Sequence, residues 1–342
     1  MDQIDIVLPW VDDTDAVWKK EREKYMGSFK ESRKNLAHYF RDWDTLRYVF
    51  RSIEKNMPWV RYIHFITCGH LPSWLNKNHS KIKIHNHNDF FSADSALPTF
   101  SSHPIEMNLH NIPSLAEKFI YFNDDTLVTR EVGPDRFFKG NQTIDYLVLD
   151  IPRYGWLYDH LRIKDVYGYI CKNDIEILNK RYPLSKLVKH KPILFFDQSY
   201  STADRLRNHV FSSFRFYKWI KINHNPQAFL LSNVKKCVNE FSDTVKNTVI
   251  HRFRNSEDVN QYLFRFYNLF RGDFIPHYFN DDFCIVLASL DRYKKERQNL
   301  FTKAFICLND SPFLNAKEYP ALKELVTGDL NDLFPQKSAF EI

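Results

Sequence analysis

The stretch that most constrains the fold is a short apolar run that ends abruptly in polar and acidic residues. Residues 119–125 read Phe-Ile-Tyr-Phe-Asn-Asp-Asp. Such a run suits a buried strand, and open α/β sheets bind ligands at the carboxyl ends of their strands. Packing does not easily explain the two adjacent carboxylates, Asp124 and Asp125, because unpaired buried charge is costly. They suit a hard divalent cation that neutralises a substrate phosphate, although Asn and Asp also form ordinary solvated turns.

A second acidic cluster follows the first apolar run of the chain. Residues 4–11 have strand character, and Asp12, Asp13 and Asp15 come directly after them. Two strands that each end in carboxylates could place several acidic groups along one edge of a sheet. Capping of a helix that starts near Val17 is the alternative. A cap accounts for one of these aspartates but not easily for all three.

Strand and helix patterns alternate along the chain. Besides residues 4–11, strands are predicted at 61–67, 82–85, 118–123, 145–150 and 305–308. Helices are predicted near 16–33 and at 44–57, 105–112, 174–181, 200–217, 232–241, 256–271 and 316–334. This rhythm indicates an α/β fold with a mixed, largely parallel sheet, flanking helices and a helical insertion or lid.

The composition favours a folded chain with a well-supplied core. The 342 residues are 44% apolar and 16% aromatic, which argues against disorder. With only 8 glycines, no glycine-rich phosphate loop can be assembled. Phosphate binding must then depend on Arg, Lys, a metal ion or helix N-termini. The five cysteines are scattered, which argues against a disulfide framework and against a structural zinc site.

The sequence also predicts the cellular compartment of the protein. It has no apolar segment of about 18 residues or more, so neither a signal peptide nor a transmembrane helix is expected, and the expected compartment is the cytoplasm. The net charge of +6 could favour peripheral association with the cytoplasmic face of an anionic inner membrane, or with a polyanionic product. Ordinary surface charge is the alternative explanation.

Four blocks of the sequence, in family order, resemble the Stealth family of sugar-phosphate transferases. The first is residues 5–15, Asp-Ile-Val-Leu-Pro-Trp-Val-Asp-Asp-Thr-Asp, in which Asp13 stands where the family typically has Gly. The second is long and specific, and it extends over residues 41–125. The third begins with His-Asn-Pro at 224–226 and ends at 258, and the fourth is Ile-Cys-Leu-Asn-Asp at 306–310.

The resemblance implies transfer of a sugar 1-phosphate from a nucleotide sugar to a sugar hydroxyl, which forms a phosphodiester. Bacterial members are similar to capsule polymerases, and UDP-N-acetylglucosamine is the family-typical donor. The partners expected are therefore a nucleotide-sugar donor and a saccharide acceptor, and no nucleic acid. We expect a Rossmann-like or glycosyltransferase-A-like sheet. Residues 1–150 would form the core that binds the nucleotide sugar, 151–223 a variable insertion or lid, and 224–342 the rest of one catalytic unit.

Four residues take catalytic roles in this interpretation. A His-x-Pro sequence is a family feature implicated in catalysis, and a neutral His224 suits removal of a proton from the acceptor hydroxyl. Arg254 matches a family arginine that would hold the donor phosphates by bidentate contacts. A carboxylate, Asp12 or Asp125, could replace His224 as the base. The expected cofactor is Mg²⁺ or Mn²⁺, bound near Asp124, Asp125 and Asp310.

Five further residues are predicted to bind substrate. Arg47 and Arg51 could face the nucleotide, or they could pair with a neighbouring glutamate and solvent. Glu106 could reach the edge of the sheet, or it could be an exposed helix carboxylate. Asn123 precedes the paired aspartates, and Asn309 belongs to a second strand that ends in Asn-Asp and is expected at the same edge.

Two other functions remain open from the sequence. A conventional metal-dependent glycosyltransferase attacks the anomeric carbon and releases a nucleoside diphosphate, and acidic strand ends with a cation would serve it equally well. A non-enzymatic protein that binds polyanions is compatible with the net charge. No nucleic-acid motif is visible, however, and the basic residues are interspersed with acidic ones.

Overall fold

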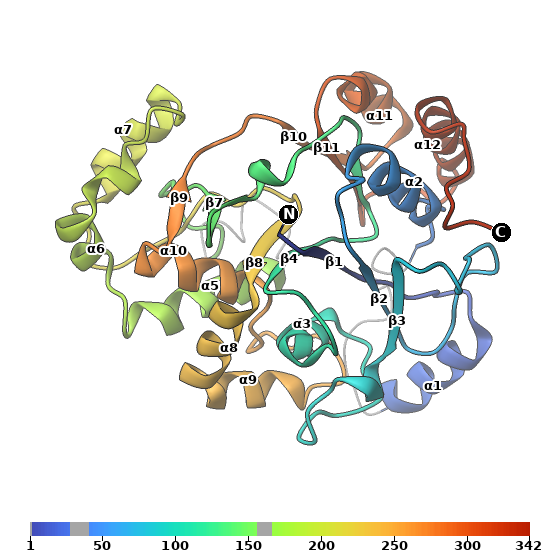
Figure 1. Ribbon diagram of the computed structural model, residues 1–342, viewed down its shortest axis with the longest axis horizontal. Coiled ribbons are helices and arrows are strands. Elements are labelled where there is room, and N and C mark those ends of the chain that lie inside the picture. Colours follow the sequence, from blue (N-terminus) through green and yellow to red (C-terminus); the bar gives the residue numbers. More distant parts are fainter. Residues whose placement is uncertain (1, 28–40, 156–165) are drawn as a thin grey trace.

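A five-stranded sheet forms the centre of the structure, a computed structural model that describes residues 2–27, 41–155 and 166–342 (Figure 1). Its strand order is β3-β2-β1-β4-β8. The strands are β1 (Ile4–Pro9), β2 (Ile63–Thr67), β3 (Ile82–Asn86), β4 (Lys118–Tyr121) and β8 (Gln227–Leu230). The first four are parallel and β8 is antiparallel to β4. The prediction of a mixed, largely parallel α/β sheet is confirmed.

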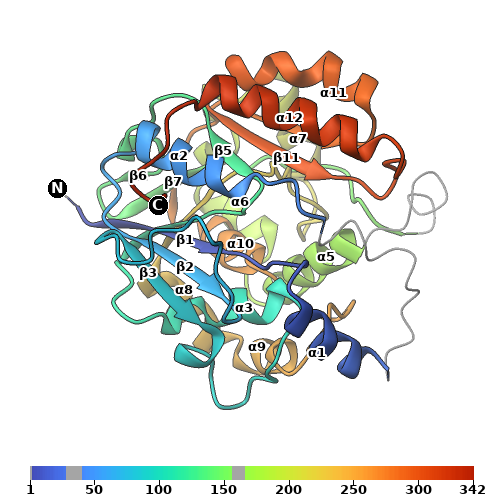
Figure 2. The same ribbon diagram turned by 90° about the vertical axis from the view of Figure 1, so that its right-hand side faces the viewer.

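Helices cover both faces of this sheet, as Figure 2 shows. Ile6 and Leu8 of β1 enter one hydrophobic core with α2 (Leu46–Asn56) and α12 (Tyr319–Leu333). Val7 enters a second core with α3 (Ser102–Asn108) and α10 (Tyr262–Arg271). A sheet that is covered on both faces needs apolar side chains on both, which is why its strands read as continuous apolar runs.

Two three-stranded sheets flank the large one. The first has the order β10-β11-β5, and the second has the order β6-β7-β9. Their strands are β5 (Thr126–Val128), β6 (Phe138–Lys139), β7 (Gln142–Asp145), β9 (Phe274–Pro276), β10 (Asp282–Leu287) and β11 (Phe305–Asp310). Only Phe122 to Asp125 separate β4 from β5. The Asn-Asp-Asp sequence therefore lies where the chain passes from the large sheet to a small one.

The middle of the chain is largely helical. Its helices are α5 (Val166–Asn179), α6 (Leu184–His190), α7 (Thr202–Phe211), α8 (Leu231–Glu240) and α9 (Ser242–Val249). Nearer the two ends of the chain lie α1 (Ala16–Met26) and α11 (Leu290–Glu296). Buried residues of α5, such as Ile175 and Leu178, pack in the same core as Phe264 of α10. Within the described ranges, none of the helices combines the length and apolar character that a membrane span requires. The three-part division of the chain stays a prediction.

Several predicted boundaries differ from the structure. The strand predicted at 145–150 is wrong, because β7 ends at Asp145 and Leu149 makes only an isolated bridge to Ile220. The helix predicted at 256–271 begins only at Tyr262, since Asp258 accepts hydrogen bonds that hold residues 251–258 in a turn. The helix predicted at 200–217 ends at Phe211. Residues 28–33 of the first predicted helix lie outside the described residues, and β8, β9 and β10 were not predicted.

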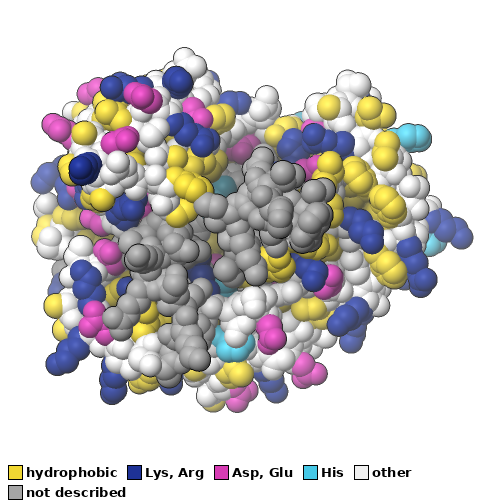
Figure 3. Space-filling view, turned by 180° about the vertical axis from the view of Figure 1, so that it is seen from behind, with side chains coloured by type: hydrophobic (Ala, Val, Ile, Leu, Met, Phe, Trp, Pro, Cys, Tyr) yellow, Lys and Arg dark blue, Asp and Glu magenta, His cyan; other side chains and the backbone are white. Residues whose placement is uncertain are grey.

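Charged side chains are mixed on the molecular surface. On the face shown in Figure 3, the described Lys and Arg side chains lie scattered among Asp and Glu. A protein that binds polyanions is expected to gather its basic residues on one face or along one stripe. This view gives no support to such a function.

Arg51 is held by the C-terminal part of the chain rather than by the sheet edge. Its guanidinium makes two hydrogen bonds to the Glu341 carboxylate, each 2.7 Å long, and a third to the Phe334 carbonyl oxygen at 2.8 Å. The two side chains of the ion pair are 8% and 2% exposed. The structure thus gives Arg51 a stabilising contact and does not bring it to the proposed substrate site.

We expect Arg51→Ala to destabilise the fold, because it leaves a buried carboxylate without its partner. Breaking a buried pair in this way costs about 3–5 kcal/mol of the free energy of unfolding. Chemical denaturation monitored by circular dichroism measures the loss. Arg47→Ala is the matched control, since Arg47 pairs at 3.5 Å with Asp44 and both side chains are at least 33% exposed. A surface pair contributes only about 0–1 kcal/mol, so equal losses in the two variants would contradict this assignment.

Candidate active site

The ends of β1 and β4 meet at one edge of the large sheet. The two strands are parallel neighbours, with Val7 opposite Tyr121, so the residues that follow them emerge at the same side. Thr45, just before α2, donates a hydrogen bond from its hydroxyl to the Asp124 carbonyl oxygen at 3.1 Å. The loop before α2 therefore lies against the same edge. The ends of β1 and β4 therefore lie at the same edge of the sheet, as the sequence predicts.

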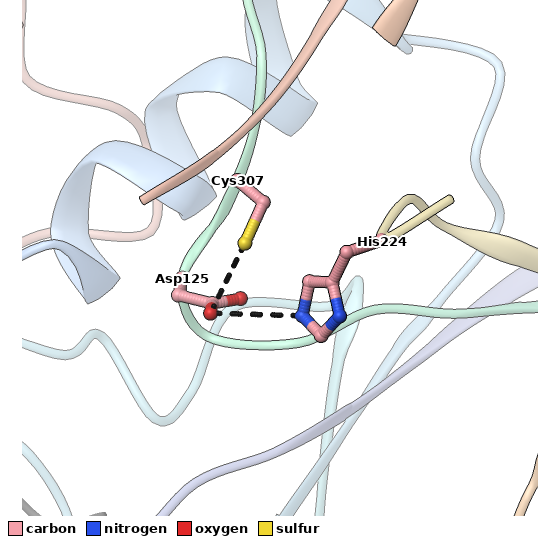
Figure 4. Close-up of side chains that lie close together, drawn as sticks. All are labelled: Asp125, His224 and Cys307. Atoms are coloured by element: carbon pink, nitrogen blue, oxygen red, sulfur yellow. Dashed lines mark hydrogen bonds and ion pairs between the residues drawn. The ribbon is translucent and has the colours of Figure 1, made fainter. Parts of the chain in front are cut away.

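His224 reaches this edge through the antiparallel pairing of β8. Gln227 at the start of β8 lies opposite Tyr121 at the end of β4, so the loop before β8 lies beside the loop after β4. His224 Nε2 lies 3.7 Å from Asp125 Oδ2 and 3.1 Å from Asn123 Nδ2. Figure 4 shows the imidazole with one ring nitrogen directed at the Asp125 carboxylate. The fold thus brings His224 to Asn123 and Asp125, although His224 lies 101 positions after Asn123 in the sequence.

Cys307 is a member of this group that the sequence did not indicate. It lies on β11 opposite Thr126 of β5, the residue after Asp125. Its thiol donates to Asp125 Oδ2 at 3.3 Å, and the Thr126 hydroxyl donates to Asp125 Oδ1 at 3.2 Å. Asp125 is therefore held from both oxygens. Cys307 stands in the fourth block that resembles the family, but only the pairing of β5 with β11 shows where its side chain lies.

Burial and neighbouring charge shift the pKa values of the two aspartates in opposite directions. The pKa of Asp124 is raised to about 7, first by burial and then by the charge of Asp125, with a smaller contribution from Asp42. Burial also raises the pKa of Asp125. The neighbouring His224 and the hydrogen bonds from Cys307 and Thr126 outweigh it and hold that pKa below its ordinary value. The Asp125 carboxylate is therefore the more readily ionised of the two.

The same interaction stabilises the protonated imidazole. Burial lowers the pKa of His224, but the Asp125 carboxylate, 3.7 Å away, raises it to about 9. At neutral pH, Asp125 and His224 thus form an ion pair in the protein without substrate. The base form of His224 becomes more populated as the pH rises.

A titration followed by nuclear magnetic resonance tests this ion pair directly. In protein freed of metal ions, we expect the His224 imidazole to titrate with a pKa of about 9. Asp125→Asn removes the charge that stabilises the imidazolium, so the pKa of His224 is expected to fall toward its ordinary value. His224→Gln identifies the resonance. An unshifted pKa in both the parent protein and Asp125→Asn would contradict the interaction.

Glu106 and Arg254 lie near Tyr121 at the end of β4. The Tyr121 hydroxyl donates to Glu106 Oε1 at 3.2 Å, and the backbone amide of Gln261 donates to Glu106 Oε2 at 2.7 Å. Burial raises the pKa of Tyr121, Glu106 and Asp124 raise it further, and the positive charge of Arg254 opposes them. Asp124 and Arg254 thus act electrostatically on the same phenol. Glu106 is buried behind the edge, and both of its oxygens accept hydrogen bonds from the protein.

The aspartates after β1 have different structural roles. Asp15 caps α1, because its Oδ1 accepts from the Trp18 amide at 2.6 Å. Asp12 Oδ1 accepts from both the amide and the hydroxyl of Thr14, and the Asp12 amide donates to His70 Nε2 at 2.7 Å. Capping accounts for one aspartate of the cluster. Asp12 shapes the turn at the end of β1, and its catalytic role stays a prediction.

Within the described residues, no hydrogen bond or ion pair joins Arg47, Asn309 or Asp310 to the Asp125–His224 pair. The strand β11 nevertheless reaches it, because the Leu308 amide donates to the Asp125 carbonyl oxygen at 2.9 Å. Asn309 is exposed on β11, and Arg47 lies over the Trp74 ring. Asp310 ends β11 in a three-stranded sheet, not in the large one, and Arg41 holds its Oδ1 at 2.7 Å. The strand predicted at 305–308 is therefore not part of the large sheet, and the site roles of Asn309 and Asp310 stay predictions. The cause is the pairing of β11 with β5 and β10.

Family models match the N-terminal part of the chain. The model described as Stealth protein CR1, conserved region 1, matches residues 2–30. The model described as Stealth protein CR2, conserved region 2, matches residues 39–146. The second match includes Asn123, Asp124 and Asp125.

Several curated proteins are similar to the chain over its full length. Capsular polysaccharide phosphotransferase WcwK of Streptococcus pneumoniae is 31% identical over 353 residues, with 100% of this chain and 98% of that protein covered. Receptor polysaccharide phosphotransferase WefC of Streptococcus oralis is 29% identical, with 100% of both covered. Exopolysaccharide phosphotransferase cps2G of Lactiplantibacillus plantarum is also 29% identical, with 99% and 96% covered.

A search of solved structures found the galactosyltransferase LgtC in complex with donor and acceptor sugar analogues. The TM-score is 0.39 at 14% sequence identity, and the match covers 96% of this chain and 95% of LgtC.

Proposed function

The chain belongs to the Stealth protein family, and on that premise we propose that it transfers a sugar 1-phosphate from a nucleoside-diphosphate sugar to a sugar hydroxyl in a surface polysaccharide. The observation that carries this proposal is similarity over the whole chain to capsular and exopolysaccharide phosphotransferases. The Asp125–His224 pair at the sheet edge supplies chemistry that suits the reaction. UDP-N-acetylglucosamine as donor, and a location in the cytoplasm or at the cytoplasmic membrane face, stay predictions.

In the proposed mechanism, the acceptor hydroxyl gives its proton to Nδ1 of His224, the ring nitrogen that does not face Asp125. The acceptor oxygen then forms a bond to the phosphorus that carries the sugar. The bond from that phosphorus to the bridging oxygen breaks, and a nucleoside monophosphate leaves. Asp125 orients the imidazole and stabilises its protonated form. Arg254 binds the donor phosphates and offsets their charge.

The residues at the edge suit a hard divalent cation. Asp124 and Asp125 are adjacent carboxylates, and the charge of Asp125 adds to burial in raising the pKa of Asp124. A bound Mg²⁺ or Mn²⁺ would relieve this repulsion and neutralise charge on the donor diphosphate. Asp310 is a weaker candidate ligand, because Arg41 already offsets its charge.

Removal of divalent cations is expected to abolish turnover. EDTA should stop the reaction because the diphosphate and the two aspartates would then repel one another. Addition of Mg²⁺ or Mn²⁺ to the treated enzyme should restore the rate. If the enzyme keeps full activity after exhaustive chelation, the reaction does not require a divalent cation and this part of the proposal is wrong.

The decisive test of the function is identification of both products. Purified protein is incubated with a panel of nucleotide sugars and saccharide acceptors, and phosphorus magnetic resonance and chromatography follow the products. A phosphodiester together with a nucleoside monophosphate supports the proposal. Release of a nucleoside diphosphate supports a conventional glycosyltransferase instead. Salt-dependent binding of polyanions without any turnover supports a binding protein.

A further inference from the structure

Three different donor atoms converge at the candidate active site. They are the thiol sulfur of Cys307, a carboxylate oxygen of Asp125 and a ring nitrogen of His224, and all lie within 4.8 Å of one another. They come from β11, from the loop after β4 and from the loop before β8, as Figure 4 shows. A mixed sulfur, nitrogen and oxygen set is unlike the all-oxygen set that Mg²⁺ requires.

The distances in this group fit tetrahedral coordination with little movement. Bonds of about 2.3 Å to sulfur and about 2.0–2.2 Å to nitrogen and oxygen, at tetrahedral angles, separate sulfur from oxygen by about 3.6 Å and nitrogen from oxygen by about 3.4 Å. The structure has 3.3 Å between Cys307 Sγ and Asp125 Oδ2 and 3.7 Å between His224 Nε2 and Asp125 Oδ2. These two separations differ from the tetrahedral values by only a few tenths of an ångström, and the third, between the Cys307 sulfur and the His224 nitrogen, lies within 4.8 Å.

The group is accessible and supplies three ligands. The side chains of His224 and Asp125 are 35% and 27% exposed, so an ion can reach them from solvent. Three protein ligands with an open fourth position are typical of zinc sites that bind water or substrate. Cysteine thiolate and imidazole select zinc-like ions, whereas carboxylates alone favour Mg²⁺ and Mn²⁺.

We propose that Asp125, His224 and Cys307 form a zinc site, which shares Asp125 with the proposed site for the hard cation, and that zinc bound there inhibits the transfer. On binding, the Cys307 thiol and the His224 imidazolium each release a proton to solvent, and Asp125 exchanges its partners for the ion. The zinc site itself does not depend on the proposed function, but the inhibition does. Zinc would bind both Nε2 of His224 and the carboxylate of Asp125, so these two groups would no longer pair with each other.

Zinc binding to chelator-treated protein tests the site without any activity assay. Isothermal titration calorimetry with Zn²⁺ alone is expected to show one tight site in the parent protein. Cys307→Ser should weaken it by about 100-fold or more, since loss of even an outer partner of a metal ligand costs about 10–100-fold. Cys237→Ser is the matched control, because Cys237 is also a buried free cysteine but lies on α8, outside the three-donor group. It should retain the parent affinity.

A spectroscopic measurement identifies the ligands. Co²⁺ in place of zinc should give a thiolate-to-metal charge-transfer band in the parent protein and in Cys237→Ser, and no such band in Cys307→Ser. Circular dichroism and a second variant, Cys307→Ala, establish that a loss of binding does not reflect unfolding. Absence of a tight zinc site in folded parent protein, or equal affinity in the two serine variants, would overturn the proposal.

An activity assay then separates the inhibition from the function. In the presence of Mg²⁺, micromolar Zn²⁺ is expected to inhibit the parent enzyme and Cys237→Ser, and to inhibit Cys307→Ser only at much higher concentration. Zinc that binds with the predicted ligand dependence but leaves turnover unchanged would refute the inhibition and keep the site. If no phosphodiester forms under any condition, the proposed function is wrong. The binding measurements still show whether the zinc site exists.

Discussion

Asp125→Asn is expected to lower turnover by a factor of about 100 or more, the scale of losing a key electrostatic or acid–base group. Asparagine nearly preserves the shape of the side chain, and its carbonyl oxygen can still accept the hydrogen bond from Thr126 or Cys307. The negative charge is lost, and with it the stabilisation of the His224 imidazolium. A proposed ligand for the hard cation is lost as well. We therefore expect a folded protein with little activity.

Steady-state turnover and thermal unfolding of the same preparations measure this effect. Asp15→Asn is the matched control, because Asp15 caps α1 and asparagine caps helices about as well as aspartate. The control should keep both the rate and the stability of the parent protein. Unchanged turnover in Asp125→Asn would reduce Asp125 to a turn residue between β4 and β5.

The sequence predicted the parts of the site that depend on local pattern. The apolar run before Asp125 predicted both a buried strand and its end, because a strand covered on both faces must be apolar throughout. His224 was singled out through the resemblance to the Stealth family, since one histidine among 14 carries no signal of its own. Its contact with Asp125 follows from the antiparallel pairing of β8 with β4, and β8 was not predicted.

Other residues could not be assigned from local pattern, because their partners are distant in the sequence. Arg51 lies on the same helix as Arg47, and only the fold shows that Glu341, 290 residues later, neutralises it. Cys307 is one of five scattered cysteines, and only the register of β11 against β5 brings it to Asp125. The end of β11 resembles the end of β4 in sequence, yet strand pairing assigns it to another sheet. Strand pairing is a long-range property that periodicity does not encode.

Substitution of His224 and of Arg254 should have different kinetic effects. His224→Ala removes a proton acceptor from the transition state and no phosphate contact, so turnover should fall by a factor of about 100 or more with donor affinity largely intact. Arg254→Lys keeps the charge but loses the planar fork of the guanidinium, so both donor binding and turnover should suffer. Steady-state kinetics and equilibrium binding of the donor separate the two effects. A fall in donor affinity alone for His224→Ala would contradict its role as the base.

The pH dependence of kcat/KM decides which group is the base. If neutral His224 accepts the proton, the rate rises with pH along a limb set by the imidazole, and this limb lies above the ordinary pKa because Asp125 stabilises the protonated form. His224→Ala should lose the limb. Asp125→Asn should move what activity remains to a limb at lower pH, since the pKa of His224 falls when the neighbouring charge is removed. If His224→Ala keeps the same limb, the proton goes instead to a carboxylate, Asp12 or Asp125, and the protonated imidazole serves only to stabilise negative charge.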